Sequence, residues 1–324
     1  MMPDLVPPTI QDVFKARATI RRYIPPTPLI KPWALCDHLG AEVYVKCENM
    51  QPIGAFKVRG GIYLMSTLSQ EERSKGVVTA STGNHGQSVA YSARLFGVHA
   101  VIYAPIGANP FKVASMRSLG AEVRLEGRDY EESREASEEA ARREGFRYIH
   151  AVNEPKLFAG VGTIGLEILE EVPDIDFIIV PIGGGSGCSG TGIVAKALRP
   201  EAKVIGVQAE QAPAVYRSWQ TKKITSTGPV NTFADGLATR QTYQFALDVL
   251  SRVVDDMVLV SEEEMERGIL TLAETAHLVA EGAGAASTAA AFKIKDRIQG
   301  KKVALVLSGG NLTIDKLKEI ARKY

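Results

Sequence analysis

Short apolar runs rich in β-branched residues alternate with helical patterns along almost the whole chain. Several runs are apolar on both faces, which is typical of parallel-sheet strands covered by helices on both sides. With 324 residues, 45% of them hydrophobic, the chain has enough apolar material to bury such sheets. We therefore predict an α/β fold with open, mostly parallel twisted sheets. The predicted strands are Glu42–Lys46, Gly76–Ala80, Ala100–Tyr103, Glu122–Leu125, Phe177–Pro181, Lys203–Gln208, Asp256–Val260 and Lys302–Leu307.

Two of the intervening helices carry clear end signals. An amphipathic helix over Asp129–Glu144 is followed by Gly145, a common stop residue. A second helix follows Ser261, with Glu264 at the capping-box position. Apolar residues recur along it at helical spacing and predict a core-facing stripe.

The short β-α steps between residues 54 and 149 predict a small unit within a larger one. Residues 1–53 and 150–324 would form the larger unit. No repeat and no low-complexity linker separates the two.

Charge and composition argue against several classes of partner. The 38 basic and 37 acidic residues leave a net charge of +1, which does not favour nucleic acid or an anionic membrane. The three cysteines show no CxxC spacing, and no apolar run approaches the ~20 residues that span a bilayer. Residues 1–13 lack a signal pattern. We expect a reduced, cytoplasmic protein without a nucleic-acid or membrane partner.

Lys57 lies in an unusually apolar setting, the segment Gly54-Ala55-Phe56-Lys57-Val58-Arg59-Gly60-Gly61. A partly desolvated lysine at a helix start has a lowered pKa and forms imines with carbonyl compounds. A surface lysine in a glycine-bounded turn is the alternative interpretation.

A polar loop, Ser81-Thr82-Gly83-Asn84-His85-Gly86-Gln87, links the strand that ends at Ala80 to a helix expected over Ser88–Phe96. Free N–H groups at a helix N-terminus bind anions, and glycines permit close approach. An ordinary capping turn with a hydrogen-bonded His85 would also explain this loop.

Two glycine-rich turns follow the strands that end at Pro181 and Leu307. Gly183-Gly184-Gly185-Ser186-Gly187 precedes a helix expected over Ser189–Leu198, an arrangement that cradles phosphate with backbone N–H groups. Its spacing matches neither a Walker loop nor a dinucleotide fingerprint. Ser308-Gly309-Gly310-Asn311 would place a hydroxyl at the carboxyl edge of the sheet, where α/β proteins bind ligands. Flexible turns are the alternative in both places.

In this order, the four motifs resemble the fold-type II pyridoxal-phosphate enzymes, most closely the serine/threonine dehydratase and serine racemase branch. The resemblance runs from Thr27-Pro28-Leu29 to Asn311. It implies a two-domain fold like that of the tryptophan synthase β-subunit, pyridoxal 5'-phosphate as the cofactor, a small amino acid as the substrate, and a homodimer.

The resemblance also assigns roles to individual residues. Lys57 corresponds to the Schiff-base lysine, Phe56 packs on the cofactor ring, Asn84 bonds the ring hydroxyl, and Ser308 faces the pyridine nitrogen. The residues matched to cofactor binding are Phe56, Lys57, Asn84, Gly183, Gly184, Gly185, Ser186, Gly187, Gly236, Glu281 and Ser308. Those matched to the substrate are Ser81, Thr82, Gly83, Asn84 and His85, and those matched to catalysis are Lys57, Ser81 and Thr82. A helix-start carboxylate is the alternative role for Glu281.

Three departures from the family pattern bear on function. Ser186 stands where the phosphate loop usually has another glycine, which changes the loop shape. Thr82 replaces the serine that acts as second acid/base in the racemases, which weakens a racemase assignment. Tyr216 replaces an acidic cation ligand beside Glu210 and the Ala214 carbonyl, so we expect no metal site.

The resemblance implies elimination of the β-hydroxyl group from L-threonine or L-serine, giving a 2-keto acid and ammonia. His85 stands where the cysteine-synthase branch usually has threonine, which favours a β-hydroxy amino acid. A neutral Ser308 stabilises a pyridinium less well than aspartate, which favours elimination over transamination. An amino-acid racemase or β-replacement synthase of the same fold remains an alternative. A non-catalytic phosphate-binding module that uses Gly183–Gly187 is a further one.

Overall fold

The computed structural model describes residues 5–228 and 230–324, which form an α/β fold built on two sheets. Every predicted strand is present, with ends within one residue of the prediction. The strands are β1 (Leu29–Ile30), β2 (Glu42–Cys47), β3 (Val77–Ala80), β4 (Ala100–Ala104), β5 (Glu122–Leu125), β6 (Arg147–Tyr148), β7 (Phe177–Pro181), β8 (Lys203–Ala209), β9 (Asp256–Val260) and β10 (Lys302–Leu307).

The larger sheet has six strands in the order β1-β2-β10-β7-β8-β9. All neighbours are parallel except β1, which pairs antiparallel with β2. Alternate residues of its central strands enter different cores: Ile178 lies in one buried cluster and Ile179 in the other. The prediction that helices cover both faces is therefore confirmed.

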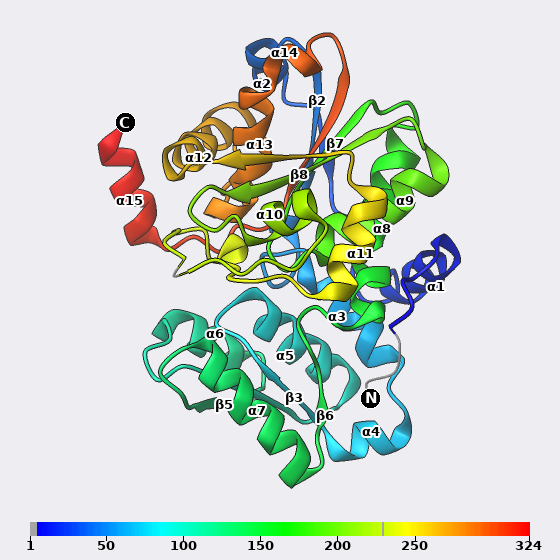
Figure 1. Ribbon diagram of the computed structural model, residues 1–324, viewed down its shortest axis with the longest axis vertical. Coiled ribbons are helices and arrows are strands. Elements are labelled where there is room, and N and C mark those ends of the chain that lie inside the picture. The colour runs from blue at the N-terminus through cyan, green and yellow to red at the C-terminus, as the bar shows by residue number, and fades with distance from the viewer. Residues whose placement is uncertain (1–4, 229) are drawn as a thin grey trace.

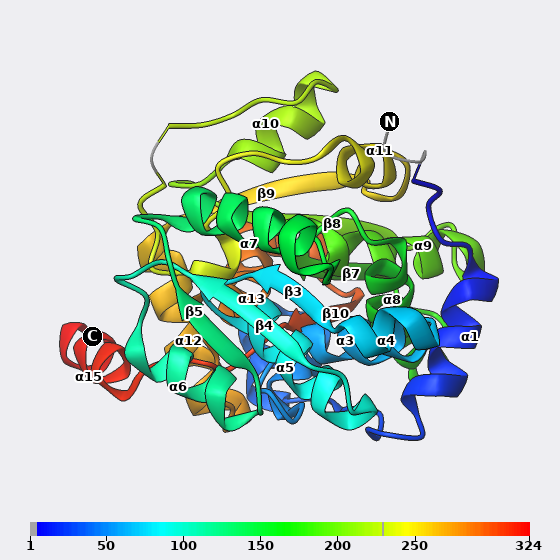
Figure 2. The same cartoon turned by 90° about the horizontal axis from the view of Figure 1, so that it is seen from below.

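The smaller sheet has four parallel strands in the order β5-β4-β3-β6. Figure 1 shows it as the lower half of the molecule, and Figure 2 shows α7 and α5 on its opposite sides. Val78 and Tyr103 pack with Ala140 of α7, whereas Ile102 packs with Val89 on the α5 side. The proposed domain boundaries at residues 54 and 149 stay a prediction.

The helices alternate with these strands. They are α1 (Ile10–Ile20), α2 (Trp33–Leu39), α3 (Lys57–Ser66), α4 (Gln70–Lys75), α5 (Asn84–Phe96), α6 (Pro110–Ser118), α7 (Tyr130–Glu144), α8 (Pro155–Glu171), α9 (Ser186–Leu198), α10 (Ala214–Thr221), α11 (Gln244–Val253), α12 (Glu262–Ala276), α13 (Gly282–Lys293), α14 (Lys295–Ile298) and α15 (Ile314–Lys323). Short 3-10 turns, η1 (Glu48–Met50) and η2 (Asp235–Leu237), complete the fold. None of the helices in the part of the chain described is long and apolar enough to cross a membrane.

The predicted end signals are confirmed. Asp129 caps α7, and Gly145 ends that helix with a φ of +80°. Ser261 and Glu264 form the expected capping box of α12. Two other starts were predicted too late, because α5 begins at Asn84 and α9 at Ser186. The polar and glycine-rich loops therefore run directly into the first helical turns.

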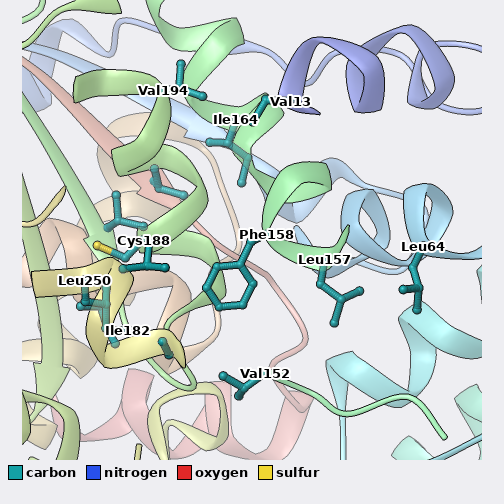
Figure 3. Packing of buried hydrophobic residues seen from close by; sticks show 14 of the residues in the cluster. Val13, Leu64, Val152, Leu157, Phe158, Ile164, Ile182, Cys188, Val194 and Leu250 are labelled. Atoms are coloured by element: carbon teal, nitrogen blue, oxygen red, sulfur yellow. The ribbon is translucent and has the colours of Figure 1, made fainter. Parts of the chain in front are cut away.

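A continuous apolar cluster packs beneath the glycine-rich turn and the first turn of α9. Figure 3 shows Phe158 of α8 beside Cys188 of α9, with Ile182 and Leu250 close by. Cys188 is fully buried just after the glycine-rich turn. The turn thus rests on a packed core rather than on a mobile surface.

Candidate active site

The topology brings three of the four motifs to one edge of the larger sheet. β2, β10 and β7 are parallel neighbours, so their carboxyl ends lie side by side. Lys57 follows β2, Ser308 follows β10, and the glycine-rich turn follows β7. This edge is where open α/β sheets bind ligands.

Lys57 is the first residue of α3, and its neighbours hold it at the sheet edge. The Ser88 hydroxyl donates to the Lys57 carbonyl oxygen at 2.7 Å. The N–H of Phe56 donates to the Ser308 carbonyl oxygen at 3.0 Å. Burial lowers the pKa of Lys57 to about 8, although the nearby Glu281 opposes the shift. A sizeable fraction of this amine is therefore neutral, and nucleophilic, near pH 7.5.

The glycine-rich turn is shaped by close contacts that leave little or no room for side chains. A Cβ on Gly183 would lie 2.0 Å from the Gly236 carbonyl oxygen, and one on Gly187 would lie 3.1 Å from the Phe56 ring. Gly185 has a φ of +101°. Within the described residues, the N–H groups of Gly183–Gly187 have no hydrogen-bond acceptor. Together with the N-terminus of α9, they form a cradle for a dianion.

One cavity collects the residues expected at the cofactor. Its lining comprises Phe56, Lys57, Asn84, Pro181, Gly183, Gly184, Gly185, Ser186, Gly187, Gly236, Leu237, Glu281, Ala283 and Ser308. Asn84 Nδ2 donates to Glu281 Oε1 at 2.8 Å. Burial raises the pKa of Glu281 to about 6, despite this hydrogen bond. Every residue matched to cofactor binding thus lies at a single cavity wall.

A second cavity, of about 310 Å³, adjoins the first at Gly184 and contains Ser81, Thr82 and His85. The Ser81 hydroxyl accepts from the N–H groups of Gly83 at 3.1 Å and Gly86 at 2.8 Å. It therefore satisfies two N–H groups at the start of α5, while the N–H groups of Thr82, Asn84 and His85 have no acceptor among the described residues. These N–H groups are suited to a carboxylate. The substrate and catalytic roles of the loop residues stay predictions.

The His85 ring is neutral and does not form an ion pair with a carboxylate. The Thr79 hydroxyl donates to the Ile149 carbonyl oxygen at 2.8 Å, so it accepts from His85 Nε2 at 3.1 Å. Burial, with repulsion from Lys57, lowers the pKa of His85 to about 3. The ring is neutral, with its proton on Nε2, and its bare Nδ1 cannot donate to a carboxylate. The backbone N–H is the donor that His85 has to offer.

Sequence reasoning missed several residues of these walls. His150, Tyr130 and Tyr243 line the second cavity, and the His150 ring packs edge-on against Tyr243. His150 Nδ1 accepts from the backbone N–H groups of residues 152 and 153, both at 2.9 Å. His150 and Tyr243 lie in irregular segments and Tyr130 is the first residue of α7, and none of the three belongs to a recognisable motif. Asn311 belongs to the predicted Ser308–Asn311 motif, but its contacts with Ile53 and Asn84 could not be predicted from the sequence.

The chain belongs to the family of pyridoxal-phosphate dependent enzymes, whose sequence profile matches residues 20–309. This confirms the expected fold-type II class and the cofactor.

Several proteins of known name are similar to this chain over most of its length. The chain is 41% identical to an L-threonine ammonia-lyase of Thermotoga maritima over 315 residues, 97% of this chain and 78% of that protein. It is 37% identical to an L-threo-3-hydroxyaspartate ammonia-lyase of Saccharomyces cerevisiae, covering 95% and 94% of the two chains. Maize serine racemase superposes with a TM-score of 0.93 at 31% identity, covering 98% of each chain. Threonine deaminase isoform 2 of Solanum lycopersicum gives 0.92 at 30% identity, covering 99% of this chain and 93% of that one.

The observed residues fit pyridoxal phosphate. The glycine cradle suits its phosphate, and the amine of Lys57 lines the same cavity. In residues 5–228 and 230–324, no three His, Cys, Asp or Glu side chains are grouped as metal ligands. Glu210 pairs with Lys293 at 3.0 Å.

Proposed function

We propose that the chain removes the β-hydroxyl group of L-threonine or L-serine and releases a 2-keto acid and ammonia. The observation that carries this proposal is the shared cavity wall of Lys57, the glycine cradle and Ser308, which opens toward free N–H groups at the start of α5. The names of the relatives, L-threonine ammonia-lyase among them, support this reaction class.

Each step uses a group of this chain. The N–H groups of Thr82, Asn84 and His85 hold the substrate carboxylate at the positive end of α5. Asn84, which lines the cofactor cavity, would also donate to the ring hydroxyl of the cofactor. When bound, pyridoxal phosphate withdraws electrons from the substrate α-carbon. The neutral Lys57 amine takes the α-proton and delivers a proton to the departing hydroxyl group, which leaves as water. Hydrolysis of the released enamine then gives the keto acid and ammonia.

Ser308 supports elimination in particular. It is buried, and its hydroxyl cannot stabilise a protonated ring nitrogen as a carboxylate would. A weaker electron sink favours prompt loss of the β-substituent.

The test is to incubate the purified holoenzyme with L-threonine and with L-serine. We expect 2-ketobutyrate and pyruvate, respectively, each with an equal amount of ammonia, and neither with Lys57→Ala. The absence of keto acid from both substrates would overturn the proposal.

Racemisation is the second candidate, favoured by the similarity to maize serine racemase. Thr82 lines the substrate-side cavity, and its hydroxyl would have to act as the second acid. D-serine accumulating from L-serine faster than pyruvate would support this alternative.

We also propose that the protein is a cytoplasmic homodimer with domain boundaries near residues 54 and 149, as its family membership suggests. Sedimentation analysis tests the dimer.

A further inference from the structure

Asn311 lies at the junction of three segments that build the cofactor cavity. Its Nδ2 donates to the Ile53 carbonyl oxygen at 2.9 Å and to Asn84 Oδ1 at 2.7 Å. Asn84 Nδ2 in turn donates to Glu281 Oε1 at 2.8 Å. The chain of hydrogen bonds therefore runs from the backbone before Lys57, through Asn311 and Asn84, to Glu281.

The hydrogen bond to Ile53 decides which amide atoms of Asn311 and Asn84 donate and which accept. A backbone carbonyl oxygen only accepts hydrogen bonds, so the atom of Asn311 that faces Ile53 must be its NH₂ group. Both of its N–H bonds are then used, one on Ile53 and one on Asn84. The Asn84 atom that faces Asn311 must accordingly be the acceptor, Oδ1, which leaves the Asn84 NH₂ group on the side of Glu281.

We propose that Asn311 is a positioning residue that turns an N–H of Asn84, and not its carbonyl oxygen, toward the cofactor. Asn84 has two N–H bonds, and Glu281 takes one. The other is available to an oxygen of the cofactor ring, because Asn84 lines that cavity. Without Asn311, the Asn84 amide loses one of the two hydrogen bonds that set its orientation, and the contact with Glu281 is the one that still directs its NH₂ group. This inference rests on the proposed role of Asn84 in cofactor binding.

The backbone around Asn311 holds it in place. The N–H of Gly310 donates to the Gly54 carbonyl oxygen at 2.9 Å, and that of Glu281 donates to Gly309 at 3.1 Å. A Cβ on Gly54 would lie 2.6 Å from Asn311 Oδ1, so the amide is closely enclosed. The loop therefore joins the Lys57 segment to Glu281, and Asn311 extends it to Asn84 of α5.

The test is a double-mutant cycle on the apparent dissociation constant of pyridoxal phosphate, measured by dilution of the holoenzyme. Loss of one hydrogen bond predicts that Asn311→Ala weakens cofactor binding about fivefold to tenfold. In the Asn84→Ala background, the same substitution should change the constant less than about twofold, because Asn311 acts through Asn84. The isosteric Asn311→Asp, which has no N–H donor, should weaken binding at least as much and guards against a folding defect.

Asn49→Ala is the matched control. Asn49 donates to the Val279 carbonyl oxygen at 3.1 Å beside Gly310, but it lies outside the cavity wall. We expect it to leave cofactor affinity unchanged.

Two results would overturn the inference. One is an unchanged constant in Asn311→Ala, and the other is an undiminished effect of Asn311→Ala in the Asn84→Ala background. An unchanged constant in Asn84→Ala itself would instead remove the proposed role of Asn84, and this inference with it. Because the readout is cofactor affinity, none of these results depends on which amino acid is the substrate.

Discussion

Arg59, two residues after Lys57, makes a sharp test of what holds α3 in place. Its side chain is fully buried. Nε and Nη2 donate to the two oxygens of Glu48, both at 2.7 Å, and Nη1 and Nη2 donate to those of Glu167 at 2.6 and 2.7 Å. Nη1 also donates to the Thr163 hydroxyl at 3.1 Å. Lys46, likewise buried, pairs with Glu167 at 2.7 Å.

Arg59→Met should destabilise the protein strongly. Four charge-assisted hydrogen bonds at about 1.5–3 kcal/mol each would suggest a loss above ~6 kcal/mol. That sum is too large for two reasons. Lys46 still pairs with the charge of Glu167, and a carboxylate left without a partner can take up a proton. Breaking a buried ion pair typically costs about 3–5 kcal/mol, and we expect the loss in that range.

The loss should depend on pH. Although burial raises the pKa of Glu167, Arg59 and Lys46 bring it below its ordinary value. The wild type therefore gains stability above the unfolded pKa and loses it as the pH falls through the folded one. Without the guanidinium, the pKa of Glu167 should rise, because Lys46 alone then opposes the effect of burial, and protonation would relieve part of the penalty in mild acid. The difference between wild type and variant should thus shrink from pH 7.5 to pH 5.

The assay is urea unfolding of the holoenzyme, followed by circular dichroism at a fixed cofactor concentration. Arg297→Met is the matched control, because it removes a half-exposed pair with Asp256 at 2.7 Å. Surface pairs of this kind contribute below about 1 kcal/mol. If Arg59→Met lost no more than Arg297→Met, or if its loss grew toward pH 5, the reasoning would be refuted.

Three further predictions concern the cofactor. Lys57→Ala should abolish turnover and the visible absorbance of lysine-bound pyridoxal phosphate, and an intact visible spectrum would point to another lysine. The rate of cofactor uptake by the apoprotein should increase with pH, with a midpoint near the Lys57 pKa of about 8, because the neutral amine attacks the aldehyde. Stopped-flow absorbance at constant ionic strength measures this rate, and a rate that does not change with pH would contradict the prediction. Gly187→Ala should weaken cofactor binding about tenfold, because its Cβ would press on the Phe56 ring at 3.1 Å. Gly107→Ala, at an open position, is its control in the same titration.

The sequence predicted eight of the ten strands in the described residues, missing the two-residue strands β1 and β6, and it predicted the loops that line the cavity, because these loops belong to local strand–turn–helix signals. The glycine-rich turn, for instance, is recognisable from residues 177–198 alone. Its exact helix start was missed because glycine and serine have low helix propensity. The first turn of α9 nevertheless forms, since the packed core below supports it.

Contacts between distant segments could not be predicted in this way. Asn311 and Asn84 are 227 positions apart, and Arg59 and Glu167 are 108 apart. From the local sequence alone, an asparagine in a turn and an arginine in a helix are expected to be surface residues. Their function depends on which partners the fold brings to them, and no periodicity in a single sequence carries that information.

The two buried networks share a property that explains how they can lie so close to Lys57. The ion cluster contains Arg59, Lys46, Glu48 and Glu167, so its charges cancel, and the Asn311–Asn84 link is an uncharged amide pair. An unpaired guanidinium two residues from Lys57 would lower the amine pKa by repulsion. Instead, burial alone lowers the pKa of Lys57, with Glu281 opposing it. Both networks can therefore fix the geometry of α3 and of the cavity wall while leaving the reactivity of the amine to be set by its burial.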